Sequence, residues 1–178
     1  MGYDTVLSGL MSFLEGISND PVLYSIIFFI YAIAATIILP IPVEAGLFLS
    51  NATPPIVMAL VLGLGKATGS ILVFLLGDKL ESPLDRITSK WGFVKWLTDI
   101  MHWFVSKTHY VGMYLILSTP LMMDTVPIYI FAVFNKEGAM SLRGFAITNF
   151  LAGITRAFIV YWVAYQFGIV LVESVPTP

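Results

Sequence analysis

The sequence has no cysteine and little charge. The absence of cysteine among its 178 residues excludes disulfides, thiolate zinc sites, Fe–S clusters and a cysteine nucleophile. Charged residues make up 11% of the chain, against about 25% in soluble proteins. Hydrophobic residues make up 58%, and the mean hydropathy is +0.89. The net charge of −2 leaves no basic surface for nucleic acid. This composition predicts an integral membrane protein, and we expect no cofactor, no metal site and no enzymatic activity.

Two segments are long and apolar enough to cross a bilayer as helices, since a span of about 30 Å needs roughly 20 residues. They are residues 56–77 and 144–168. Between them, residues 79–107 carry five Lys or Arg residues, whereas the chain before Lys66 and after Arg156 carries none. Because cytoplasmic loops are enriched in Lys and Arg, residues 79–107 are expected on the cytoplasmic side of a multi-pass protein of the cell membrane.

Prolines interrupt the other two apolar stretches. Residues 108–135 would leave the cytoplasmic side and return to it, yet they are too few for two spans of about 20 residues each, so they predict a re-entrant hairpin. Residues 21–54 begin and end without basic residues and predict a hairpin entered from outside, although residues 21–39 could span alone. The predicted breaks are at Pro40 and Pro42 in the first hairpin and at Pro120 and Pro127 in the second.

The two long helices share a pattern. Each has one base with a glycine three residues before it, Gly63 before Lys66 and Gly153 before Arg156. Ala59 and Asn149 stand seven residues before the bases, so both bases share a helix face with small or polar residues that another backbone can approach. The predicted fold is therefore all-α, with two inverted repeats, each a re-entrant hairpin followed by a transmembrane helix. Its single membrane domain, 1–178, divides into an N-terminal amphipathic segment 1–20, repeat 1 at 21–78, a cytoplasmic linker 79–107 with an amphipathic interfacial helix, and repeat 2 at 108–172.

Only four charged residues lie in the apolar stretches: Glu44, Lys66, Asp124 and Arg156. A charge in the hydrocarbon core costs roughly 2.5–3.5 kcal/mol on insertion scales, so these four are expected to face one another or a wet cavity. We predict two pairs across the repeats, Glu44 with Arg156 and Asp124 with Lys66. A static role, in which buried pairs only fix the helix register, is the alternative.

The runs ILPIPVEAGLFLS and LGLGKATGSILVFLLGD resemble the DedA family, also called the VTT or SNARE-associated Golgi protein family. Its members have a proline-rich hairpin that ends in P-x-P-x-E, followed by a helix with spaced glycines. Glu44 matches the hairpin glutamate, and Gly65, Gly69 and Gly77 match helix glycines. The chain departs from the family at Ser70, where many members have an acid, and it lacks the arginines expected around 117–124.

The resemblance implies transport of a lipid or a polyprenyl-phosphate carrier between leaflets, coupled to protons. Burial disfavours the charged form of a carboxyl group while a nearby base favours it, and this balance suits proton coupling by Glu44 and Asp124. The expected partners are anionic lipid headgroups and protons, and a homodimer is plausible for so small a chain. Two alternatives remain open: a proton-coupled exporter of small cations or drugs, and a membrane protein with a purely structural role. Tyr161, Trp162 and Tyr165 are expected to face lipid.

Overall fold

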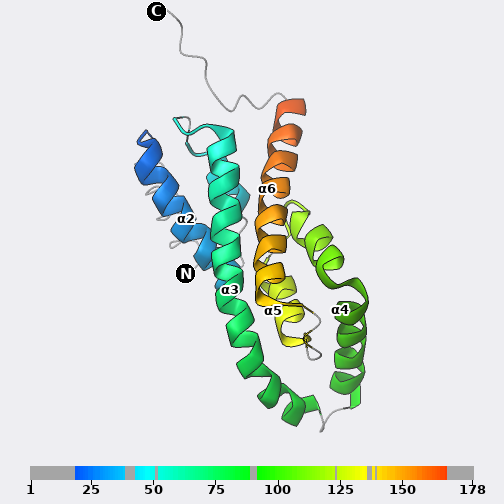
Figure 1. Ribbon diagram of the computed structural model, residues 1–178. Coiled ribbons are helices and arrows are strands. Elements are labelled where there is room, and N and C mark those ends of the chain that lie inside the picture. Colours follow the sequence, from blue (N-terminus) through cyan, green and yellow to red (C-terminus); the bar gives the residue numbers. More distant parts are fainter. Residues whose placement is uncertain are drawn as a thin grey trace, which may run out of the picture.

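The computed structural model describes residues 19–38, 43–50, 52–88, 92–122, 124–135, 138 and 140–167, with the backbone alone for 78–88, 92–99, 101 and 102. Residues 1–18 of the predicted N-terminal segment, together with Pro40 and Pro42, lie outside this set. All regular secondary structure in the described part is helical, and this part contains no strand (Figure 1). Its elements are α2 (Pro21–Ile37), the short 3-10 helix η1 (Val43–Leu47), α3 (Pro55–Thr88), α4 (Gly92–Ser118), α5 (Thr125–Val133) and α6 (Leu142–Gln166).

Helix α2 begins where the sequence places a capping pair. Asp20 accepts hydrogen bonds from the backbone N–H groups of Val22 and Leu23, each at 3.0 Å. Pro21 follows at the first helical position, where its missing N–H removes no helical bond. Tyr24 and Phe28, four residues apart, are fully buried on one face. The opposite face is exposed and apolar, with Val22, Ile26 and Ile30 more than half exposed.

Helices α3 and α6 each contain a stretch long and apolar enough to cross a membrane, Pro55–Gly77 and Leu142–Gln166. These stretches agree with the predicted spans within two residues at each end. Helix α3, however, continues to Thr88, past residue 79, where a linker was expected to begin. Most of the expected linker is likewise helical, because α4 starts at Gly92. Charged residues are compatible with a helix that extends beyond its apolar part, so the change in composition after Gly77 marks the end of the apolar stretch only.

Glycines let α3 approach its neighbours closely. A Cβ atom on Gly153 of α6 would lie 2.9 Å from the Cα of Gly63 on α3, and one on Gly63 would lie 2.9 Å from the carbonyl oxygen of Phe150. The two helices therefore cross at the glycines that precede the two bases. The shared pattern predicted a close backbone approach on these faces but did not predict which backbone it would be. Gly65 and Gly69 instead face α2, where added Cβ atoms would come within 2.5 Å of Ala32 and 2.7 Å of Thr36.

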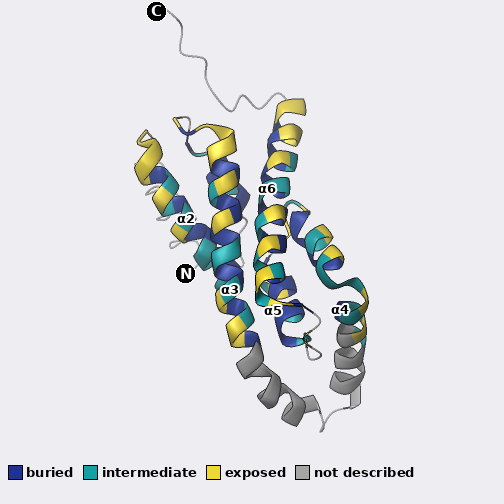
Figure 2. Cartoon of the chain, in the orientation of Figure 1, coloured by how far each residue is buried: buried dark blue, intermediate teal, exposed yellow. Residues whose placement is uncertain are grey.

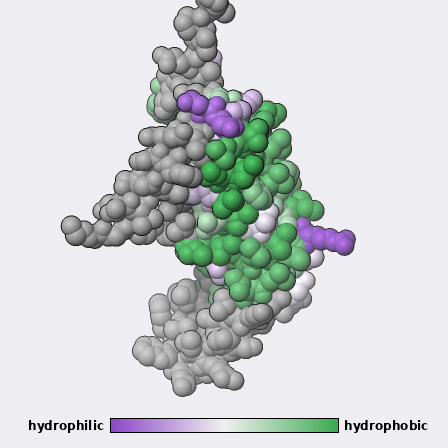
Figure 3. Space-filling view, turned by 90° about the vertical axis from the view of Figure 1, so that its left-hand side faces the viewer, coloured by the Kyte–Doolittle hydropathy of each residue, from purple (hydrophilic) through white to green (hydrophobic). Residues whose placement is uncertain are grey.

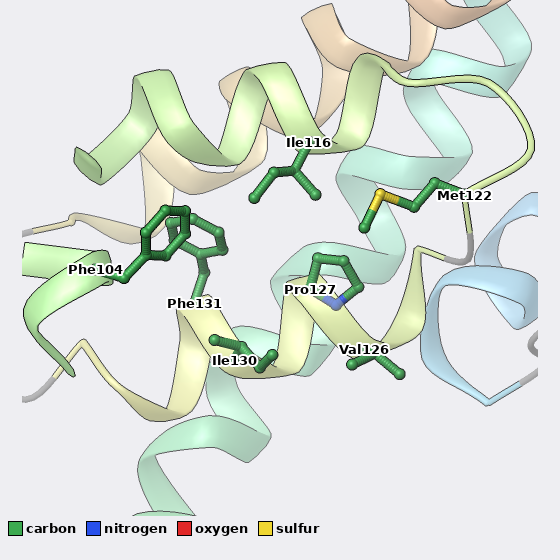
Figure 4. A pocket seen from close by; sticks show the side chains of 7 residues that line it. All are labelled: Phe104, Ile116, Met122, Val126, Pro127, Ile130 and Phe131. Carbon is green, nitrogen blue, oxygen red and sulfur yellow. The ribbon is translucent and has the colours of Figure 1, made fainter. Parts of the chain in front are cut away.

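Helix α4 bends at His109, which has a φ of 44° and a ψ of −133° (Figure 1). Beyond the bend it runs to Ser118, and α5 then passes back along it (Figures 1 and 4). Pro120 lies in the connection between them, as predicted. Pro127 does not mark a break, because it is the third residue of α5. The first N–H groups of a helix have no partner within it, so a proline there removes no bond.

Two apolar cores are stacked along the molecule. One joins α2 and η1 to the first turns of α3 and the last turns of α6. The other joins α4 and α5 to the middle of α3 and the first half of α6. Lys66 on α3 and Arg156 on α6 lie between the two cores. Buried and exposed positions alternate around both long helices (Figure 2), and the described surface seen from the side of α2 is mainly hydrophobic (Figure 3).

Candidate functional site

Arg156 is the centre of a buried network of charges. Its Nε donates to Oε1 of Glu44 at 2.5 Å, and its Nη1 donates to Oδ1 of Asp124 at 2.5 Å. Its Nη2 donates to the backbone carbonyl of Met122. One guanidinium group thus connects α6 to η1 and, through Met122 and Asp124, to the α5 end of the connection between α4 and α5. A planar group with five donors is suited to this task, whereas an ammonium is not.

Lys66 completes the network from α3. Its Nζ lies 3.1 Å from Oδ1 of Asp124, the oxygen that also binds Arg156, and 3.2 Å from the carbonyl oxygen of Leu117. Leu117 is in the last turn of α4, where carbonyl groups have no helical partner and the helix dipole is negative. Lys66 therefore neutralises a carboxylate and also caps the end of α4.

We call Glu44, Lys66, Asp124 and Arg156 the charge network. Both pairs predicted from the sequence are present, and the bond from Arg156 to Asp124 joins them into one unit. All four side chains are at most 5% exposed. Two acids balance two bases, so the fully ionised network carries no net charge. Such balance is needed where burial makes an unpaired charge very costly.

Two tyrosines hold η1, and with it Glu44, in place. The hydroxyl of Tyr24 donates to the carbonyl of Gly46 at 2.5 Å, and that of Tyr161 donates to the carbonyl of Leu47 at 3.3 Å. Tyr161 was expected to face lipid, but it is only 9% exposed because η1 and Phe48 pack against it. By contrast, Trp162 and Tyr165 are exposed as expected.

Backbone groups supply the other partners of Glu44 and Arg156. The N–H of Leu121 donates to Oε1 of Glu44 at 2.9 Å, while the carbonyl of Met122 accepts from Arg156. No sequence pattern marks these groups, because every residue carries them. The only available signal was Pro120, which predicts that backbone groups near it are free of helical bonds.

The remaining predicted site residues have packing and local bonding roles in the structure. Gly63 and Gly153 form the crossing of α3 and α6 next to the bases, and a Cβ on Gly153 would lie 3.1 Å from Cδ of Lys66. Ser70 is fully buried and donates to the carbonyl of Ala67 within α3. Asn149 is also buried and donates to the carbonyl of Phe145, while its Oδ1 has no partner among the described residues.

Two apolar cavities lie close to the charge network. The first, the α4–α5 groove, has a volume of about 460 Å³ and ends at Met122, whose carbonyl binds Arg156. Its lining comes from α4 on both sides of the bend, from α5 and from Met122 in the connection between them (Figure 4). The residues that line it are Phe104, Ile116, Met122, Val126, Pro127, Ile130 and Phe131.

The second cavity, the Glu44 pocket, has a volume of about 210 Å³ and lies between η1, the end of α6 and the α4–α5 connection. Glu44 is the one charged residue in its lining. The Oε2 atom of Glu44 is buried and has no hydrogen-bond partner within the described part of the chain. The other residues that line the pocket are Phe48, Pro120, Leu121, Val160, Val163, Ala164 and Phe167.

The chain matches no protein-family model, no curated protein and no solved structure.

Proposed function

We propose that the chain is a multi-pass transporter of the cell membrane, of the DedA type, that moves a lipid or a polyprenyl-phosphate carrier between leaflets with proton coupling. The observation that carries this proposal is the charge network, in which four ionisable side chains from otherwise apolar segments meet in one buried unit. Ionisable residues within membrane segments are costly and commonly belong to substrate or proton pathways. The exposed apolar surfaces of α2, α3 and α6 are consistent with contact with lipid.

In the proposed topology, α3 and α6 span the bilayer, and two hairpins enter it from opposite sides. The stretch from α2 through η1 is the first hairpin, and the stretch from the second half of α4 through α5 is the second. Each hairpin with the span that follows it would form one inverted repeat. The acids then come from the hairpins and the bases from the spans, an arrangement that brings both repeats to one site.

In the proposed mechanism, the carboxylates and the substrate compete for the bases. Protonation of Glu44 and Asp124 would remove the negative charge that Arg156 and Lys66 bind. An anionic headgroup would then take over the donors of both bases, Arg156 as a fork and Lys66 as a point charge. Departure of the headgroup on the other side would restore the pairs and release the protons. Both the headgroup and the protons would thus be needed for one cycle.

A cation exporter receives less support from the same geometry. Such a protein needs acids that face a cavity while its bases are bound elsewhere. Here both bases bind the very carboxylates that a cation would have to reach. An exchange between acids and an anionic headgroup fits this pairing better.

The test is movement of a labelled polyprenyl phosphate or phospholipid between the leaflets of liposomes, with and without a pH gradient. We expect wild-type protein to move the lipid faster under the gradient, and Glu44→Gln and Arg156→Met to abolish the response. Asp20→Asn is the matched control, because it removes an exposed acid outside the network and asparagine still caps α2. No movement by folded wild-type protein under any gradient would refute the proposal.

A further inference from the structure

The α4–α5 groove has two different ends. At one end Phe104, which precedes the bend of α4, meets Phe131 of α5 edge to face, with ring centroids 5.9 Å apart (Figure 4). At the other end lies Met122, which is 40% exposed. Between the ends, Ile116 of α4 lies across from Ile130 of α5 (Figure 4). The groove therefore leads from Met122, at the α4–α5 connection, to an aromatic pair.

The lining of the groove suits hydrocarbon better than water. Every side chain in the lining is apolar, whereas a buried water molecule requires two to four polar partners. Two backbone carbonyls near the Met122 end are already bound, that of Leu117 by Lys66 and that of Met122 by Arg156. The volume of about 460 Å³ lies within the range of roughly 300–1,000 Å³ that is usual for ligand pockets. The groove thus has the size and the chemistry to hold a hydrocarbon chain.

The Met122 end of the groove adjoins a base. Met122 belongs to both sites, because its side chain lines the groove and its carbonyl accepts from Nη2 of Arg156. The Nε and Nη1 atoms of Arg156 bind carboxylates, so Nη2 is the nitrogen whose described partner is uncharged. An anionic oxygen is a stronger acceptor for a guanidinium group than a neutral carbonyl. An acidic headgroup at this end could therefore bind Nη2 without first displacing a carboxylate.

We propose that the α4–α5 groove binds the hydrocarbon chain of a lipid with an acidic headgroup, with the headgroup at Nη2 of Arg156 and the chain extending toward the pair of Phe104 and Phe131. This proposal rests on the proposed function, because it assigns the place of the substrate's chain in a hairpin that lies within the bilayer. Binding in the groove requires neither a pH gradient nor movement between leaflets. Groove binding without transport would refute the proposed function alone, and transport without groove binding would refute this proposal alone.

The experiment locates the chain by photo-cross-linking to the full-length protein in lipid nanodiscs. The two probes are hexadecyl phosphate and hexadecanol, each with a diazirine at mid-chain and each used below saturation. We expect the phosphate to label the groove at least about fivefold more than a second apolar hollow, as one charge-assisted hydrogen bond to the headgroup would give. Hexadecanol should show little preference, because any apolar hollow in a bilayer accepts hydrocarbon. The second hollow lies between α3 and α6 and is lined by Leu64, Ala67, Ala146, Ile147 and Phe150.

Three variants complete the test. Ile130→Trp fills the groove and leaves the four residues of the charge network in place, and we expect it to lower labelling of the groove by the phosphate at least about fivefold. Ile147→Trp is the matched control, because it makes the same change in the second hollow, and it should leave labelling of the groove unchanged. Arg156→Met should reduce the preference of the phosphate to that of hexadecanol, and the comparison of the two tryptophan variants remains decisive if Arg156→Met does not fold.

Four outcomes would overturn the proposal. The phosphate could label the groove and the second hollow of the wild-type protein equally, or both probes could prefer the groove to the same extent. Ile130→Trp could be labelled like the wild-type protein. Neither probe could label the groove at all, as would be expected if a second copy of the chain covered it.

Discussion

Leu121 donates its backbone N–H to Glu44 across 77 positions of sequence, at 2.9 Å, while its own backbone is held at a φ of 61°. A side chain with a Cβ is disfavoured in this left-handed region by roughly 1–2 kcal/mol. The next residue, Met122, gives its carbonyl to Arg156. The α4–α5 connection is therefore held in a strained form by the same two side chains that form a pair in the charge network.

Leu121→Gly is expected to stabilise the protein. Glycine adopts a positive φ without strain, and the Leu121 side chain is 79% exposed, so little buried surface is lost. Glycine also raises the conformational entropy of the unfolded chain, which offsets part of this effect. The net gain in unfolding free energy should be roughly 0.5–1 kcal/mol. Thermal unfolding in mild detergent measures it. Thr119→Gly is the control, since Thr119 has no positive φ, and it should be destabilising. A loss of stability in Leu121→Gly would show that the strain is absent.

The two ion pairs could be predicted because isolated charges in apolar segments have few possible partners. The bond between Arg156 and Asp124 that joins the two pairs could not be predicted, because it depends on how closely the α4–α5 connection approaches α6. The backbone partners at Leu117, Leu121 and Met122 could not be predicted either, since every residue carries the same backbone groups. A positive φ at a leucine has no sequence signal either, as leucine is rarely found there.

The limits of the helices were harder to predict than their presence. The apolar runs predicted to within two residues the two helical stretches that are long and apolar enough to cross a membrane. Charged residues after Gly77 suggested a linker, yet α3 continues to Thr88, as charge does not oppose helix formation. Proline correctly predicted a break between helices at Pro120. It wrongly predicted a break at Pro127, because the first turn of a helix accepts proline and Pro127 is the third residue of α5.

Removal of Lys66 and Glu44 together should cost less than the two separate removals suggest. Each of Lys66→Met and Glu44→Gln leaves an unbalanced buried charge, at a cost of about 3–5 kcal/mol. The double variant keeps the pair of Arg156 with Asp124, which is neutral by itself. We expect its loss of unfolding free energy to be at least about 2 kcal/mol smaller than the sum of the single losses. Chemical denaturation of all three variants measures this coupling. Strictly additive losses would mean that the four residues do not act as one unit.

Arg156→Lys should destabilise the protein although lysine keeps the positive charge. The three nitrogen atoms of Arg156 bind Glu44, Asp124 and Met122 separately, and a single ammonium cannot reach all three. We expect a loss of about 2–4 kcal/mol in unfolding free energy from the unpaired buried acceptors. Arg143→Lys, at an exposed position on the first turn of α6, is the control and should change stability by less than 0.5 kcal/mol. If Arg156→Lys were as stable as the wild-type protein, the three separate bonds of the guanidinium group would not contribute to stability.

Tyr24→Phe should loosen η1 without changing its charge. The change removes the donor to the carbonyl of Gly46 and leaves that carbonyl without this buried partner, at a cost of about 1–3 kcal/mol. Tyr165→Phe makes the same change at a residue that is 78% exposed and should be neutral. Because Glu44 lies in η1, amide hydrogen exchange of residues 43–47 should rise in Tyr24→Phe alone. Unchanged exchange there would mean that the hydroxyl does not hold η1.

Gly63→Ala and Gly153→Ala test whether the helix crossing positions the two bases. In a free helix, alanine is more favourable than glycine by about 1 kcal/mol. Here each new Cβ would lie 2.9 Å from a backbone atom of the other helix, which cannot turn aside as a flexible side chain can. The helices must separate, and we expect each variant to lose about 1–3 kcal/mol in unfolding free energy.

The double variant Gly63→Ala with Gly153→Ala distinguishes this explanation from local damage. A single separation of α3 from α6 makes room for both methyl groups, so the combined loss should be clearly smaller than the sum. The same separation would draw Lys66 away from the site where Arg156 binds Asp124, and the coupling between Lys66→Met and Glu44→Gln should shrink in this background. Leu64→Ala, at the half-exposed position beside Gly63, should leave that coupling unchanged. Additive losses with full coupling would show that the crossing glycines and the charge network are independent.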